Sequence, residues 1–165
     1  MPVKMKRIII LLTIVSLAIM AFRSDSDVKE TYTPIFISRE TLENSVKYIP
    51  GARDMIQTGK IYYRTPYIYV NERYKGVHVI NNTNPANPVN EGFILAPGCI
   101  DMAVKGNILY IDNAVDLVSI DLDSRQVTKR IRNVFPEPSP PENFFYYGFH
   151  NRPEGYILIE WRKNN

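Results

Sequence analysis

The chain has 165 residues, of which 45% are hydrophobic and 22% charged, so it can bury a core and is not a wholly disordered protein. The net charge is +3, but the first 22 residues hold three basic residues and no acid, so the remainder is neutral. A neutral remainder argues against a nucleic-acid-binding surface, which needs clustered Lys and Arg.

The N-terminus has the pattern of an export signal. A basic start, MPVKMKR, precedes an apolar run over residues 8–22, which is shorter than the ~20 residues that span a bilayer comfortably. We predict that residues 1–22 are a secretory signal peptide cleaved after Ala21 or, if uncleaved, a membrane-anchor helix. The expected location is therefore the periplasm or cell envelope. The run does not end in the Cys that a bacterial lipid anchor requires, which argues against lipidation.

Residues 23–58 are predicted to be a tether and an N-terminal segment. The polar stretch RSDSDVKE is typical of a flexible tether, and TPIFIS (33–38) predicts a short strand. In the stretch 38–49, Ser38 suits a helix N-cap and apolar residues follow at helical spacing. The β-branched and aromatic residues of this stretch also suit an extended segment, so both readings stay open.

Residues 59–97 predict four short strands joined by turns. The strand candidates are 60–64, 67–71, 77–81 and 89–95. Thr65-Pro66 supplies the first turn, and the Asn- and Pro-rich stretch 82–88 supplies the last. This succession predicts one antiparallel meander.

Residues 98–132 predict a second meander of the same kind. Its strand candidates are 99–105, 108–112, 116–122 and 126–131, with Gly106-Asn107 as a tight turn. Tyr69 aligns with Tyr110 at an offset of 41 residues, and Ile80 aligns with Ile120 at an offset of 40. A four-stranded repeat of ~40–45 residues is typical of a β-propeller blade. The predicted fold class is all-β: two four-stranded antiparallel propeller-like blades after an N-terminal signal or anchor helix.

Two repeats are fewer than the ~4–8 blades of a closed propeller, so apolar faces and strand edges must be covered in another way. Three arrangements stay open. The two sheets stack as a sandwich, several copies assemble, or the chain is a fragment of a longer protein.

The repeat residues carry a family resemblance. Residues 76–81, 84–88, 103–107 and Tyr110 resemble the LVIVD-type repeats of exported bacterial β-propeller proteins. Asn81 stands where that repeat has Asp, and the second copy has DSRQ in place of the Asn-Pro loop. The resemblance covers residues 59–132 and implies a binding or assembly scaffold of the cell envelope.

Residues 133–165 are predicted to be a Pro-rich loop followed by a closing strand at 155–161. An aromatic group lies here: Phe144, Phe145, Tyr146, Tyr147, Phe149 and Trp161. We predict that Tyr146, Tyr147, Phe149 and Trp161 bind carbohydrate or a protein partner, because exposed Tyr and Trp favour such contacts. The alternative is that the group covers the open end of the second sheet.

No catalytic constellation is evident, and we predict a non-enzymatic protein without cofactor or metal site. His78 and His150 are the only histidines, and Cys99, the lone cysteine, is expected to be buried at a strand start. A carbohydrate-active enzyme is the alternative, in which Glu72 and Glu91 would be the carboxylate pair. The expected partners are other envelope proteins, carbohydrate or further copies of the chain. Nucleic acid is not expected, and membrane contact is expected only through residues 8–22.

Overall fold

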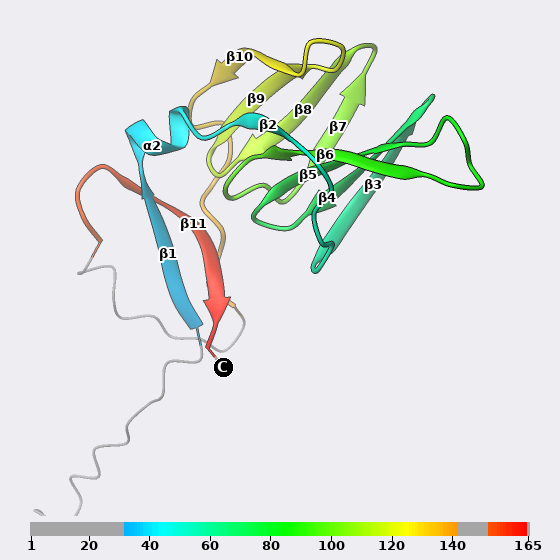
Figure 1. Cartoon of the computed structure of the whole chain (residues 1–165). Helices are drawn as coiled ribbons and strands as arrows, with labels where there is room; N and C mark the ends of the chain where they lie inside the picture. The colour runs from blue at the N-terminus through cyan, green and yellow to red at the C-terminus, as the bar shows by residue number, and fades with distance from the viewer. Residues whose placement is uncertain (1–31, 142–151, 165) are drawn as a thin grey trace, which may run out of the picture. The chain divides into compact units, whose positions relative to one another are not determined.

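The computed structural model describes residues 32–141 and 152–164 (Figure 1), and the predicted signal segment 1–22 lies outside the described residues. The elements are β1 (Tyr32–Ser38), α2 (Arg39–Glu43), β2 (Lys47–Pro50), β3 (Thr58–Arg64), β4 (Tyr67–Glu72), β5 (Gly76–Asn81), β6 (Val89–Leu95), β7 (Met102–Lys105), β8 (Ile108–Asn113), β9 (Asp116–Asp121), β10 (Gln126–Ile131) and β11 (Tyr156–Lys163). The strands form three antiparallel sheets, which confirms the all-β class for this part of the chain. Across the same residues, no helix is long and apolar enough to cross a membrane.

The stretch after β1 is partly helix and partly strand. Ser38 caps α2 as predicted, because its side chain accepts a hydrogen bond from the Thr41 N–H at 3.1 Å. The helix ends after five residues, and Lys47–Pro50 then pairs with β6 as β2. Tyr48 of β2 packs against Gly92, where any Cβ would overlap the tyrosine ring. Sheet pairing, rather than a continued helix, therefore buries the second half of this stretch.

The first sheet has five strands in the order β2-β6-β5-β4-β3. Strands β3 to β6 match the four predicted strands with ends shifted by no more than two residues, and β2 adds an edge strand within the stretch for which the extended reading stayed open. Gly76 begins β5 with a φ of 143°, and a Cβ there would overlap the carbonyl oxygen of Ile94. Only glycine combines this backbone conformation with so close an approach of the neighbouring strand.

The second sheet has four strands in the order β10-β9-β8-β7, as the second predicted meander requires. One predicted boundary is wrong, because β7 begins at Met102 and not at Cys99. The backbone N–H groups of Ile100 and Asp101 both donate to Asp112 Oδ1 at 2.9 Å, so a side chain takes the place of a strand partner there. Cys99 is fully buried, as expected, but in the turn that precedes the strand.

The two larger sheets share one hydrophobic core. It consists of Tyr69, Val77, Val79, Ile94, Ala96, Cys99, Met102, Leu109, Ile111, Val118, Ile120 and Leu122. Each buried Val, Leu or Ile contributes roughly 1.5–3 kcal/mol relative to exposure, so this layer is the main source of stability. Polar contacts join the same two faces: the Tyr62 hydroxyl donates to the Val104 carbonyl at 3.1 Å, and Arg64 donates to Asn107 at 2.9 Å.

The third sheet pairs the first and last described strands, β1 and β11. The predicted closing strand 155–161 is observed as β11, which runs antiparallel to β1 with one irregularity between Ile35 and Phe36. Ile157 of β11 packs in a small second core with Leu42 of α2 and with Ala114 and Val115 from the turn between β8 and β9. The pairing joins segments separated by almost the whole described chain, which local sequence patterns cannot reveal.

A buried ionic cluster fastens α2 to the second sheet. Asp116, which is 0% exposed, accepts hydrogen bonds from Arg39 and Arg130 at 2.8–2.9 Å and from the Asn133 N–H at 3.0 Å. Arg130 also donates to Asn113 Oδ1 at 2.8 Å. Burial alone would raise the pKa of Asp116, but these hydrogen bonds outweigh it and lower the pKa.

Candidate functional site

Of the four predicted binding residues, only one lies in the described part of the chain. Trp161 is on β11, only 7% exposed, and its indole Nε1 donates to the Pro138 carbonyl at 3.0 Å. It therefore packs beneath the Pro-rich segment. Tyr146, Tyr147 and Phe149 lie outside the described residues, so the aromatic binding platform stays a prediction.

The most developed polar site lies on the outer face of the five-stranded sheet, the face turned away from the second sheet. His78 and Glu72 are 0% and 6% exposed, and His78 Nε2 lies 3.3 Å from Glu72 Oε2. The strand register explains their meeting, because His78 pairs with Val70 and Glu72 lies two residues farther along the same strand. The alternation of His78 with Val77 and Val79 indicated its face, but the sequence did not reveal its partner.

The segment between β2 and β3, residues 51–57, crosses this face, and we call it the strap. At one end the Gly51 N–H donates to the Glu91 carbonyl at 2.8 Å, and Asn90 Nδ2 donates to the Arg53 carbonyl at 3.2 Å. At the other end the N–H groups of Ile56 and Gln57 donate to the Glu72 carboxylate. One buried carboxylate thus holds both the strap and the histidine.

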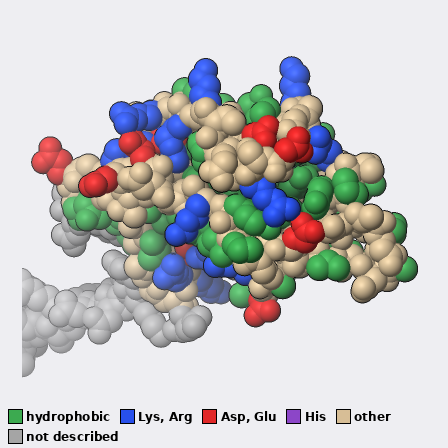
Figure 2. Space-filling model, turned by 45° about the horizontal axis from the view of Figure 1, so that its top comes forward, with side chains coloured by type: hydrophobic (Ala, Val, Ile, Leu, Met, Phe, Trp, Pro, Cys, Tyr) green, Lys and Arg blue, Asp and Glu red, His purple; other side chains and the backbone are tan. Residues whose placement is uncertain are grey.

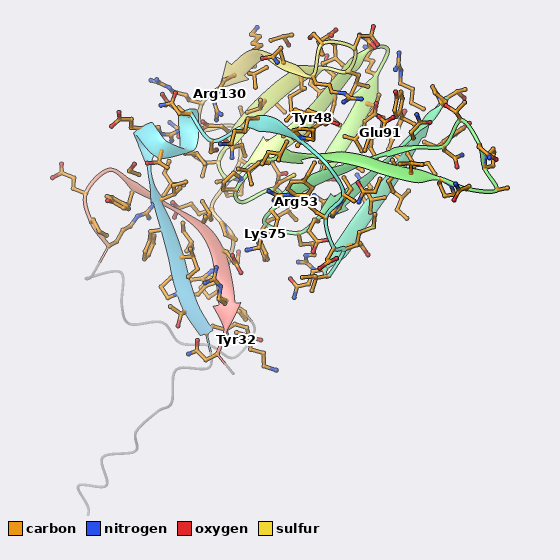
Figure 3. All side chains as sticks on the ribbon, in the orientation of Figure 1. Tyr32, Tyr48, Arg53, Lys75, Glu91 and Arg130 are labelled. Atoms are coloured by element: carbon orange, nitrogen blue, oxygen red, sulfur yellow. The ribbon has the colours of Figure 1, made fainter. Side chains whose placement is uncertain are left out.

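A cavity of about 360 Å³ lies between the strap and the sheet. Its lining residues are Arg53, Asp54, Ile56, Gln57, Glu72, Arg73, Lys75, His78, Phe93 and Leu95. The rings of Phe93 and His78 meet edge to face with their centroids 4.8 Å apart, and the Arg53 guanidinium lies 5.1 Å from the Phe93 centroid. Figure 3 labels Arg53 and Lys75 on this side of the sheet. The cavity combines an aromatic floor with basic side chains at its mouth.

A second cavity, of about 480 Å³, lies between the outer face of the second sheet and the Pro-rich residues 135–139. Tyr110 and Asp112 line it. Burial raises the pKa of Asp112, although the two backbone N–H groups that donate to its carboxylate act in the opposite direction. This cavity shows that the Pro-rich segment covers part of the second sheet.

The two carboxylates considered for glycoside hydrolysis are held apart. Glu91 accepts from Asn81 at 2.8 Å and pairs with Arg125 at 3.0 Å, whereas Glu72 holds the strap. In the register, Glu72 aligns through Gly76 with Leu95, which lies four residues beyond Glu91 on β6. At ~3.3 Å per residue this is about 13 Å along the strand, more than the ~5–9.5 Å of glycosidase pairs. The structure therefore does not bring this pair together.

Other acidic residues of the meanders have structural partners. Asp121 Oδ1 accepts from the Ser124 N–H at 2.8 Å, as is typical of an Asp that caps the following turn. Asn81 likewise accepts from the Thr83 N–H at 2.9 Å in the turn after β5. Within residues 32–141 and 152–164, no group of three His, Cys, Asp or Glu side chains is placed to hold a metal ion. On the face drawn in Figure 2, Lys and Arg side chains lie among acidic and apolar ones.

Comparisons with protein-family models, with curated proteins and with solved structures found no match to this chain.

Proposed function

We propose that this chain is a non-catalytic, exported envelope protein that serves as a binding or assembly scaffold, built from two LVIVD-like repeats that stack as propeller blades. The observation that carries the proposal is an apolar sheet face left open at one end of the stack. The basic and apolar pattern of residues 1–22 supports export.

Residues at equivalent positions of the two repeats support the blade arrangement. Tyr69 belongs to the core between the sheets, whereas its equivalent Tyr110 lines the cavity on the outer face of the second sheet. Ile120 belongs to the shared core, whereas Ile80 lies beside Val79 and so points to the outer face of the first sheet. In each pair, one residue thus faces the shared core and its equivalent faces away from it. Rotated blades stack in this way, whereas a two-fold sandwich would bury both members of each pair.

The open face belongs to the five-stranded sheet, at β3 and its neighbours. Ile61 and Tyr63 are 65% and 58% exposed, and Ile68 and Ile80 beside them are half-buried. We call these four residues the open patch. The outer face of the second sheet, by contrast, is partly covered by the Pro-rich segment. The strap covers another part of the outer face of the five-stranded sheet, so the open patch is the part of that face that stays uncovered in the described chain.

The occupant that we propose for the open patch is the same patch of a second copy. A patch that pairs with itself closes a two-fold dimer, whereas contacts between unlike faces would build open filaments. Exposed Ile and Tyr side chains on an edge strand are also an aggregation hazard unless they are covered. Self-association at this face removes the hazard without a protein of another kind.

The test is the oligomeric state of the full chain, measured by analytical ultracentrifugation. We expect a dimer that Ile61→Lys and Tyr63→Lys convert to a monomer with an unchanged circular dichroism spectrum. Val127→Lys is the matched control, because Val127 is 42% exposed on β10, outside the patch, and should leave the dimer intact. A wild-type monomer, or a dimer that survives both patch variants, would contradict the proposed interface.

The rival function is an exported carbohydrate-active enzyme, and a fragment without independent function is a third possibility. Hydrolysis of a glycan panel by the purified protein would favour the enzyme. A molten, aggregating product in a thermal melt would favour the fragment.

A further inference from the structure

We propose that the cavity under the strap binds a small carboxylate that carries a hydroxyl group on an aromatic or short aliphatic body. The cavity and the open patch lie on the same face of the five-stranded sheet but share no residue, so variants can test the two separately. Three features of the cavity, each matched to one part of the ligand, carry the proposal.

The floor of the cavity selects the apolar body. Phe93 and Leu95 line it together with the imidazole of His78, and Phe93 is only 2% exposed. A volume of about 360 Å³ is at the lower end of the ~300–1,000 Å³ of ligand pockets, so it suits a ligand of one ring or a short chain.

The mouth of the cavity selects the negative charge. Arg53 and Arg73 contact the rings of Phe93 and Tyr74, and neither forms an ion pair with any described residue. Of the two carboxylates in the lining, Glu72 is already bonded to the strap and to His78, which leaves Asp54 against two arginines. Guanidinium groups bind carboxylates in bidentate fashion, so an anionic group fits this position.

The buried histidine selects the hydroxyl. A carboxylate can only accept, so in the neutral ring the Nε2 that faces Glu72 carries the hydrogen and Nδ1 is an acceptor. His78 is 0% exposed, and its Nδ1 has no hydrogen-bond partner among residues 32–141 and 152–164. A buried polar atom without a partner costs free energy, and a hydroxyl donor from a ligand would remove that cost. The same geometry makes Glu72 a positioning residue, because it sets which ring nitrogen of His78 carries the hydrogen.

The experiment uses three probes that differ by one group each. The probes are 4-hydroxyphenylacetate, phenylacetate, which lacks the hydroxyl, and 2-(4-hydroxyphenyl)ethanol, which lacks the carboxylate. Binding to the full chain is followed by calorimetry and by the imidazole NMR signals, of which the chain has only two sets, from His78 and His150. We expect 4-hydroxyphenylacetate to bind and to change the chemical shifts of the His78 imidazole. Loss of the hydroxyl or of the carboxylate should each weaken the affinity by roughly 2- to 10-fold.

Surface variants locate the site without touching the core. Arg53→Gln with Arg73→Gln should weaken 4-hydroxyphenylacetate by at least about 5-fold and leave the alcohol probe unaffected. Arg132→Gln is the matched control, since Arg132 is an exposed arginine in the turn after β10 and should change neither affinity.

A variant of the buried histidine tests the contact with the hydroxyl group. His78→Phe, whose fold is checked by circular dichroism, should abolish the advantage of the hydroxylated probe over phenylacetate. The proposal would be overturned if the His78 chemical shifts did not change at up to about 10 mM probe, or if the double arginine variant bound 4-hydroxyphenylacetate with unchanged affinity. Retained binding by Ile61→Lys would separate this site from the dimer interface.

Discussion

Replacement of Asp116 by Ala should cause a large loss of unfolding free energy, and the structure allows its magnitude to be estimated. The side chain is fully buried and accepts hydrogen bonds from Arg39, Arg130 and the Asn133 N–H. Removal of one partner from a buried ion pair costs about 3–5 kcal/mol, because the other charge is left uncompensated. Arg130 keeps bonds to Asn113 and to the carbonyls at the end of α2, so we expect the lower end of that range.

Urea unfolding at neutral pH measures this cost. Asp116→Asn keeps the size and loses the charge, and we expect it to cost less than the alanine variant. Asp123→Ala is the matched control, because Asp123 is exposed and its one side-chain partner among the described residues is Asn107, so its cost should stay within about 0.5 kcal/mol. A loss below about 1 kcal/mol for Asp116→Ala would show that the cluster adds nothing net to stability.

The pH dependence gives the same prediction a second check. The pKa of Asp116 is lowered in the folded protein, so its stabilisation is present above the unfolded-state value of about 3.9 and is lost as pH falls through the folded-state value. The difference in unfolding free energy between wild type and Asp116→Asn should therefore be largest at neutral pH and shrink in acid. A difference that is constant between pH 7 and pH 3 would refute an electrostatic origin.

Two further predictions concern single positions. Gly76→Ala should cost about 2–3 kcal/mol in urea unfolding, because its Cβ would overlap the Ile94 carbonyl, whereas Gly106→Ala, with a φ of 60° and open space around it, should cost about 1 kcal/mol. Equal costs at the two glycines would show that the clash is relieved by a small backbone shift. Cys99 should react with Ellman's reagent only after unfolding, because burial, assisted by the nearby Asp112, raises its pKa well above the usual value. Rapid labelling of the native protein would contradict the packing of Cys99.

Local patterns account for most of the strands. Alternation of apolar residues, together with turn signals at Thr65-Pro66 and Gly106-Asn107, predicted the eight strands β3 to β10 with small errors at their ends. The errors occur where a side chain replaces a backbone partner, as Asp112 does ahead of β7. Alternation predicts which residues are extended, and it carries no information about such replacements.

The parts that could not be predicted all depend on contacts between distant segments. Local residues allowed Lys47–Pro50 to be extended but could not assign it to the sheet, because its partner Gly92 lies more than forty residues away. The site around His78 was missed for a similar reason, since the Glu72 partner follows from strand register and the strap from hydrogen bonds at both of its ends. A cross-strand diagonal between Glu72 and His78 was available as a signal once β4 and β5 had been paired.

The pairing of β1 with β11 makes the order of synthesis matter. Thr33 and Asn164, which are hydrogen-bonded side by side, are 131 positions apart. At about 5–20 residues per second, a ribosome needs roughly 7–26 s between them, during which β1 has no partner strand and Ile157 cannot yet cover Leu42. A nascent chain that stalls in this interval leaves an unpaired strand open to chaperones and proteases. Synthesis of β11 is thus the event that closes this end of the fold.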